Sequence, residues 1–250
     1  MKVLLATCIF IVSLALPPSA RAAGPGETAL QTSDGPVTLH VIHHASFVLD
    51  WNGKTIYVDP TESAGVYKGL GAPDLILITH AHGDHLSQAT LDVLDTSNAI
   101  VVMPQSVADK IGHRYGKVQL IMANGDTTQK DGITIHAVPM YNLTEARLKN
   151  HPKGWGNGYV LTLGGKRIYI SGDTEGTPEM RALKDIDLAF VCMNLPYTMD
   201  VTQAADAVLA FKPKVVYPYH YQGQDTAKFK QLVDAKDPHI DVRLRNWYVK

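Results

Sequence analysis

The chain has 250 residues, and its 23 lysines and arginines nearly balance its 24 aspartates and glutamates, for a formal net charge of −1. A protein that neutralises nucleic-acid phosphates needs a cationic stripe or patch, and the sequence contains none, which argues against nucleic acid as a partner. A chain of this length can bury a sufficient core without disulfides.

The first 22 residues have the composition of a signal peptide. Lys2 precedes an apolar run at residues 3–16, two prolines follow, and Ala20-Arg21-Ala22 offers the small residues that signal peptidase accepts. The alternative is a retained membrane anchor, but the run is shorter than the roughly 20 residues that a hydrocarbon core requires. We therefore predict cleavage after Ala22, export to the periplasm, no stable membrane insertion, and a flexible lead at residues 23–36.

Short strands come first in the remaining chain. Residues 37–42, 46–50 and 55–58 are β-branched or alternating runs, and Asn52-Gly53 is a typical hairpin turn between the last two. Residues 75–78 form a continuous apolar run, which is typical of a strand covered on both faces. A helical spacing of leucines begins after Ser87, which is a suitable N-cap residue.

The second half repeats this order. Residues 133–138, 159–163, 167–170, 188–192 and 215–217 are predicted strands, with Gly164-Gly165 as a hairpin turn. A helix capped by Thr202 and a second helix at residues 227–233 are expected between and after them. Two similar halves, each with strands followed by strand–helix units, predict an α/β fold in which two sheets pack together with helices outside. We expect a four-layer αβ/βα sandwich, as a single domain at residues 37–250.

The strongest chemical signal is the run from Thr79 to His85, which reads THAHGDH. His80 and His82 are two residues apart, so extended backbone directs both imidazoles to one side. Gly83 permits a turn that brings Asp84 and His85 back toward the same space. Imidazoles and a carboxylate suit Zn²⁺ or a similar borderline ion, and catalytic zinc sites keep a position open for water.

This run resembles the HxHxDH signature of the metallo-β-lactamase fold, and further blocks of that family follow in order. Asp59-Pro60 ends an early hairpin, Ser171-Gly172-Asp173-Thr174 follows a strand, and Tyr217-Pro218-Tyr219-His220 lies near the C-terminus. The resemblance covers roughly residues 37–221. Within the fold, the chain is most similar to the branch of metal-dependent hydrolases that resemble L-ascorbate-6-phosphate lactonase.

The resemblance implies a paired metal centre. His80 and His82 would hold the first cation, Asp173 would bridge, and the second cation would be held by Asp84, His85 and His220. Two divalent ions are expected, with zinc as the first choice and manganese or iron as alternatives.

One block departs from the family pattern. The family places a third ligand histidine just after the strand equivalent to residues 133–138, and this chain reads Pro139-Met-Tyr-Asn-Leu143 there. The next histidine is His151, and our hypothesis is that it takes this role. The competing interpretation is that His151 lies on a surface loop, with Asn142 or water completing the first site.

Four further residues are candidates for supporting roles. Asp59 could hydrogen-bond a ligand imidazole and fix its tautomer, against a simple turn role. His44 closes a strand and could support the ligands of the site. The competing interpretation is that it is an ordinary strand histidine. Lys153 and Trp155, in the long loop at residues 141–157, could contact substrate, although a solvated loop would have the same composition.

The predicted activity is hydrolysis of a small ester, lactone or phosphodiester. Paired cations lower the pKa of a shared water from 15.7 to about 7 and so supply hydroxide at neutral pH. Asp84 is the expected catalytic residue, because its position allows it to orient that hydroxide. The alternatives are a di-iron redox enzyme, or an exported metal-binding or partner-binding protein on a catalytically retired fold. The expected partner is a small-molecule substrate, and the sequence leaves the oligomeric state open.

Overall fold

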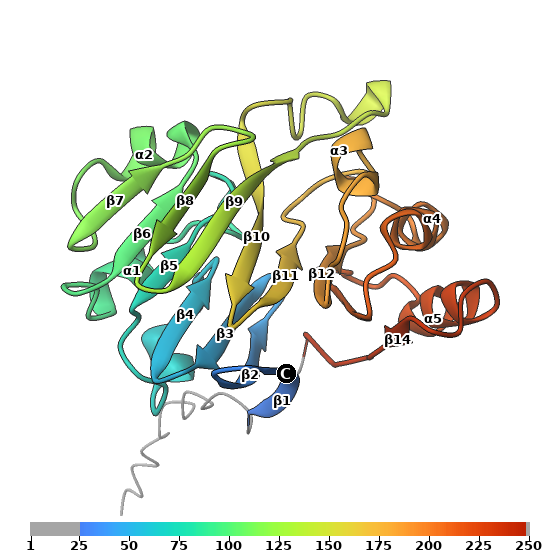
Figure 1. The fold of residues 1–250 in the computed structure, drawn as a ribbon. Coiled ribbons are helices and arrows are strands. Elements are labelled where there is room, and N and C mark those ends of the chain that lie inside the picture. The colour runs from blue at the N-terminus through green and yellow to red at the C-terminus, as the bar shows by residue number, and fades with distance from the viewer. Residues whose placement is uncertain (1–25, 249–250) are drawn as a thin grey trace, which may run out of the picture.

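Two seven-stranded sheets pack face to face, and helices cover the outer face of each (Figure 1). The computed structural model describes residues 26–248. The helices α1 and α2 flank one sheet, and α3, α4 and α5 flank the other. This arrangement confirms the predicted four-layer αβ/βα sandwich.

The first sheet changes from antiparallel to parallel at its centre. Its strands follow the chain order, with antiparallel pairs from β1 to β4 and parallel pairs from β4 to β7. The bounds are β1 (Glu27–Thr32), β2 (Gly35–His43), β3 (Ser46–Trp51), β4 (Lys54–Val58), β5 (Leu75–Leu77), β6 (Ile100–Met103) and β7 (Val118–Ile121).

The second sheet has the same design. The pairs from β8 to β11 are antiparallel and those from β11 to β14 are parallel, so the two halves are similar, as the sequence predicts. The bounds are β8 (Thr127–Lys130), β9 (Ile133–Met140), β10 (Gly156–Leu163), β11 (Lys166–Ile170), β12 (Leu188–Cys192), β13 (Val215–Tyr219) and β14 (Asp241–Val242).

The helices are short, and most begin at a side-chain cap. Ser87 caps α1 by accepting a hydrogen bond from the backbone N–H of Thr90, as expected. The cap of α4 is Asp200, in a capping box with Gln203, so the prediction of Thr202 is wrong. The helices are η1 (Ala64–Tyr67), α1 (Gln88–Val93), α2 (Gln105–Ile111), η2 (Glu145–Arg147), α3 (Pro178–Arg181), α4 (Val201–Phe211) and α5 (Thr226–Asp234).

The main core lies between the sheets and beneath α3 to α5. Phe47 of β3 stacks on Phe190 of β12 with ring centroids 4.4 Å apart, which joins the two sheets directly. A smaller apolar cluster, which includes Ile76, Val101 and Val107, fills the space between the first sheet and α1 and α2. Burial of so many aliphatic and aromatic side chains supplies the main driving force for this fold.

The segment before Val37 differs from expectation in part. Residues 23–36 were expected to form a flexible lead, but Glu27–Thr32 form strand β1, which pairs with β2. Ala29 of this edge strand is buried, and Leu30 is half-buried against the main core. The predicted signal peptide lies outside the described residues. Among the residues that are described, no helix is long and apolar enough to cross a membrane.

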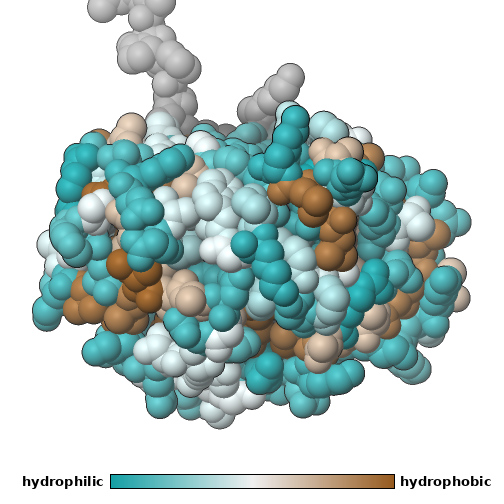
Figure 2. All heavy atoms as spheres, turned by 90° about the horizontal axis from the view of Figure 1, so that it is seen from above, coloured by the Kyte–Doolittle hydropathy of each residue, from teal (hydrophilic) through white to brown (hydrophobic). Residues whose placement is uncertain are grey.

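The surface seen in Figure 2 is largely hydrophilic and is broken by separate apolar patches. The exposed large apolar side chains of the described chain include four in the loops that follow β9 and β12. These four are Leu143, Leu148, Leu195 and Tyr197.

Candidate metal centre

The candidate site forms where several strands of both sheets end. The run 79–85 follows β5 closely, and Asp173 follows β11. His220 comes directly after β13, and His151 lies in the connection from β9 to β10. Loops at the carboxyl ends of parallel strands from two sheets thus bring together residues that are up to 140 positions apart, as expected for a site built on a rigid scaffold.

The first group of donors consists of three histidines. His80 Nε2 lies 3.0 Å from His82 Nδ1, and the ring of His151 lies 5.2 Å and 5.0 Å from the rings of His80 and His82. One ring nitrogen from each of the three lies within 4.8 Å of the other two. The structure therefore places His151 where the third histidine of the first group is expected, although the sequence has no histidine directly after β9.

The side-chain NH₂ group of Asn142, the rival for this position, is engaged elsewhere. Its side-chain amide donates to the carbonyl oxygens of Arg147 and Tyr197, at 2.9 and 2.8 Å. Its backbone N–H donates to the carbonyl of His151. His151 is only 1% exposed, which rules out the surface-loop interpretation. Asn142 thus holds the loop that carries His151, while its Oδ1 has no hydrogen-bond partner among the described residues.

Asp173 lies at the centre of a second group of donors. Its Oδ1 is 3.3 Å from His85 Nε2 and 3.4 Å from His220 Nε2. Its Oδ2 is 3.4 Å from His151 Nε2, so the two carboxylate oxygens face different histidines. Asp84 Oδ2 lies 3.3 Å from His220 Nε2. A carboxylate between two sets of imidazoles has the position expected of a bridging ligand.

Five buried polar atoms of the donor residues have no hydrogen-bond partner in the described part of the chain. They are His85 Nε2, His151 Nε2, Asp173 Oδ1 and both ring nitrogens of His220. Each unpaired buried polar atom costs about 1–3 kcal/mol. The 3.3–3.4 Å separations of the three Nε2 atoms from the Asp173 carboxylate are longer than a charged hydrogen bond of about 2.7–2.9 Å. Four ligands about 2.0–2.2 Å from a tetrahedral zinc ion lie about 3.3–3.5 Å apart, so the donors fit a metal cation.

Asp59 orients His85, as one of the two interpretations predicts. The Nδ1–H of His85 donates to Asp59 Oδ2 at 2.7 Å. The backbone N–H and the hydroxyl of Thr79 also donate to the Asp59 carboxylate, at 2.7 and 2.8 Å. Because the carboxylate can only accept, the proton of neutral His85 is placed on Nδ1 and the Nε2 lone pair faces the centre.

The backbone is strained at three residues of this site. His44, Asp59 and His220 have φ angles of 56°, 43° and 46°. Residues other than glycine adopt this left-handed region rarely, at a cost of about 1–3 kcal/mol each, and such residues cluster at functional sites. The surrounding contacts must therefore hold these side chains in place.

The charges at the centre produce a potential that favours a cation. Burial alone would lower the pKa of His85, but the carboxylates of Asp173 and Asp59 outweigh it and raise this pKa well above its usual value. Burial lowers the pKa of His80 well below the usual value, and neighbouring imidazoles lower it further. His80 is therefore neutral at pH 7, as a metal ligand must be. The carboxylates that favour a proton on His85 favour a metal ion there for the same reason.

His44 also belongs to this centre. Its Nε2 lies 3.2 Å from Asp84 Oδ2, and its ring lies 3.9 Å from the ring of His220. One donor atom each from His44, Asp84 and His220 lies within 4.8 Å of the others. His44 thus lies beside Asp84 and His220, where it can support the site as expected.

The two substrate-loop candidates have other roles. Lys153 donates to Glu179 at 2.7 Å, lies over the ring of Tyr141 and does not line the cavity at the centre. The ring of Trp155 lies 4.6 Å from the ring of His82 and 5.5 Å from that of His80. Trp155 therefore packs against the first group of histidines and shields it from one side.

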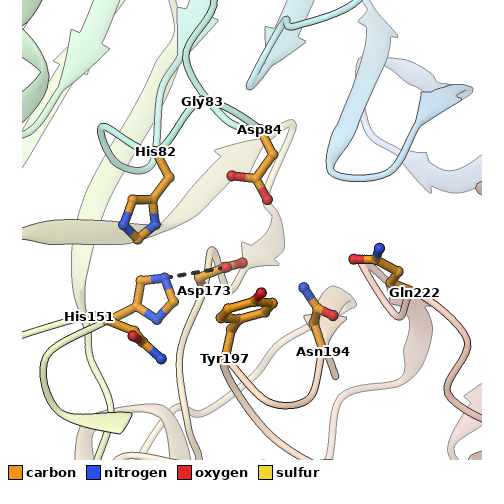
Figure 3. Close-up of a pocket in the computed structure, with 9 residues that line it drawn as sticks. His82, Gly83, Asp84, His151, Asp173, Asn194, Tyr197 and Gln222 are labelled. Atoms are coloured by element: carbon orange, nitrogen blue, oxygen red, sulfur yellow. Dashed lines mark ion pairs between the residues drawn. The ribbon is translucent and has the colours of Figure 1, made fainter.

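A cavity of about 440 Å³ opens beside the donors. In Figure 3, His82 and Asp84 point from one loop toward His151 and Asp173, while uncharged polar side chains from the loops after β12 and β13 lie around them. These are Asn194, Tyr197 and Gln222. Sequence reasoning missed them, although they lie in the loops that follow β12 and β13, the strand ends at which sites in open α/β sheets form.

The chain is similar to known hydrolases over most of its length. Residues 38–220 match the family described as Beta-lactamase superfamily domain. A UPF0173 metal-dependent hydrolase from Pyrococcus abyssi is 32% identical over 215 residues, which cover 80% of this chain and 93% of that protein.

Two solved structures resemble the whole fold. A protein assigned as a metal-dependent hydrolase from Parabacteroides distasonis is 42% identical with a TM-score of 0.81, covering 90% of this chain and 99% of that one. A metallo hydrolase from the archaeon Ignicoccus hospitalis is 25% identical with a TM-score of 0.72, covering 85% and 96%. These similarities agree with the donor set at the centre.

Proposed function

Since the chain belongs to the UPF0173 metal-dependent hydrolases of the beta-lactamase superfamily, we propose that it hydrolyses a small ester or lactone at a centre of two divalent cations. Zinc is the first choice of metal. The unpartnered buried ligand atoms of His85, His151, Asp173 and His220 carry this proposal. Such cations lower the pKa of water and polarise the oxygen of a scissile carbonyl.

The donors divide into two sets in this proposal. The first cation would be held by His80, His82 and His151, whose nitrogens lie within 4.8 Å of one another. The second would be held by Asp84, His85 and His220, with Asp173 between the two sets. Two histidine-rich sets with only two carboxylates are better suited to zinc than to a pair of iron ions, for which an acid-rich site is expected.

Asp84 is the candidate for proton transfer. Both Asp84 and Asp173 line the cavity, but the side chain of Asp84 is 45% exposed and that of Asp173 only 4%. Burial would raise the pKa of Asp84, but the neighbouring imidazoles of His220 and His44 outweigh this and hold the pKa well below the usual range. Asp84 is therefore ionised at neutral pH, and its carboxylate can orient the attacking water and accept its proton.

Asn194 is the candidate for orienting the substrate. It is 3% exposed, its Oδ1 has no hydrogen-bond partner, and it lines the cavity beside Asp173. A carboxamide in this position can donate to a carbonyl oxygen of the substrate and accept from a neighbouring hydroxyl or amide. Such a donor contributes most when charge develops on that oxygen in the transition state.

The side chains of residues 26–248 that line the cavity offer no cation for a phosphodiester. Among the described residues that line it, none is lysine or arginine. Two cations of the nearby loop are paired, with Arg147 bound to Glu175 at 2.6 Å and Lys153 to Glu179 at 2.7 Å. The third, Lys149, is exposed and does not line the cavity. The similarity of the motifs to the lactonase-like branch also supports an ester or lactone.

Metal removal and substrate choice test this function together. We expect dialysis against a chelator to abolish hydrolysis of a neutral lactone or aryl ester, and added zinc or manganese to restore it. The value of kcat/KM for such substrates should exceed that for bis(4-nitrophenyl) phosphate by at least about tenfold, since a phosphate would lack a charged contact worth about 1.5–3 kcal/mol. Hydrolysis that persists in chelator, or a preference for the phosphodiester, would contradict the proposal.

A further inference from the structure

The C-terminal segment returns to the candidate metal centre. Trp247 is fully buried, and its carbonyl oxygen accepts a hydrogen bond from the backbone N–H of His44 at 3.0 Å. The hydroxyl of Tyr248 lies 2.8 Å from His44 Nδ1. The backbone N–H of Gln222, two residues after His220, donates to the same hydroxyl at 2.8 Å. The segment is thus attached to two parts of the site at once.

The hydrogen bonds of this segment form a chain with a defined direction. The Asp84 carboxylate can only accept, so His44 Nε2, at 3.2 Å, donates to it. The Nδ1 atom of neutral His44 is then an acceptor, and it receives the hydroxyl proton of Tyr248. The Tyr248 oxygen in turn accepts from Gln222. Every group in this chain has a partner of the right kind.

Asp84 needs such an anchor more than the other donors do. Its side chain is 45% exposed, whereas those of His85, Asp173 and His220 are at most 4% exposed. A second cavity of about 490 Å³ lies on its other side, lined by His44, Gln222 and Tyr248 as well as by Asp84. A carboxylate between two cavities can rotate into solvent unless a neighbour holds it.

We propose that His44 and Tyr248 are positioning residues for the second cation, with the C-terminal tyrosine fixing the tautomer of His44, and His44 holding Asp84 against His220. This role rests on the paired centre proposed above. The backbone conformation of His44, at φ 56°, fits this role, because a strained residue is retained where its side chain must point in one direction.

Zinc binding to the full chain, without substrate, tests this proposal. Tyr248→Phe removes one hydroxyl, and His44→Asn keeps a residue that tolerates positive φ. Competition with a chelator of known affinity should show the second zinc equivalent weakened by about 10–100-fold in each variant, as for other groups that support metal ligands, with the first equivalent unchanged. The effects should not add in the double variant, because Tyr248 acts through His44.

Matched controls separate this role from general damage. Tyr115→Phe removes a hydroxyl that donates to Asp92 at 2.7 Å, and His40→Asn breaks a histidine–aspartate contact to Asp50 at 2.8 Å. Both controls should bind zinc as the wild type does, and metal-free Tyr248→Phe should unfold at the wild-type temperature. Wild-type affinity for both equivalents in Tyr248→Phe would overturn the proposal, as would an equal loss of both. A wild-type chain that binds no zinc would contradict the metal centre itself.

Discussion

Asp173→Asn is expected to lose both cations and at least about 10³-fold in turnover, since a ligand shared by two metal ions supports both. The reason is geometric: Oδ1 faces His85 and His220 while Oδ2 faces His151, so one carboxylate serves the two donor sets. An asparagine keeps the shape of the side chain but replaces one oxygen with an NH₂ group that cannot bind a cation.

The stabilisation of the fold by zinc measures this loss without any substrate. Zinc at about 100 times its dissociation constant raises the free energy of unfolding of a protein by about 2.7 kcal/mol. The unfolding temperature of the wild type should therefore rise when zinc is added, and that of Asp173→Asn should not. Asp187→Asn is the control, because Asp187 is a buried carboxylate bound to Lys214 at 2.8 Å. It should lower stability by about 1–3 kcal/mol while the zinc response persists. An undiminished zinc response in Asp173→Asn would contradict its bridging position.

His151→Ala is expected to remove the first cation selectively. His80 and His82 would keep only two nitrogens for that ion, whereas the second donor set, with Asp84, His85 and Asp173, stays complete. Affinity for the first equivalent and turnover should each fall by at least about 100-fold, since even groups that only support metal ligands contribute 10–100-fold. Metal content and hydrolysis rates measured on the same preparations check this expectation.

A histidine outside the site provides the comparison for His151. His136 of β9 is bound to the hydroxyl of Thr127 at 2.8 Å and belongs to neither donor set. His136→Ala should retain the metal content and turnover of the wild type. Unchanged metal content and turnover in His151→Ala would return Asn142 or water to consideration as the third ligand.

The sequence predicts the central strands of both sheets well, because their patterns are local. The alternation in β2 to β4 and the turns at Asn52-Gly53 and Gly164-Gly165 are visible without tertiary information, and all four turn residues have positive φ. The region between α1 and β9 was not assigned. Its strands β7 and β8 are short and carry no residue in the buried class, so they lack the periodic burial that sequence analysis detects. Strand β6 of the same region is a fully buried apolar run, which a local pattern could have shown.

In the site, too, the local patterns are predictable from the sequence and the long-range contacts are not. The donors of the run 79–85 are close in sequence, so one pattern predicts them together. The tautomer of His85 depends on Asp59, which is 26 residues away, and the neighbourhood of His44 depends on Tyr248, which is 204 residues away. Lys153 was expected at the substrate, but a local pattern cannot show that Glu179 binds its ammonium group. Contacts of this kind arise only from tertiary structure.

The metal content of the purified chain from Ala23 onward, compared with that of His82→Ala by plasma mass spectrometry, tests the metal centre most directly. His82 lines the cavity and lies 3.0 Å from His80, within the first donor set. A two-cation centre predicts about two equivalents of zinc or manganese per chain, with a sharp decrease in His82→Ala. An absence of metal from both proteins, even after reconstitution with zinc or manganese, would contradict the metal centre and the hydrolytic function proposed for it.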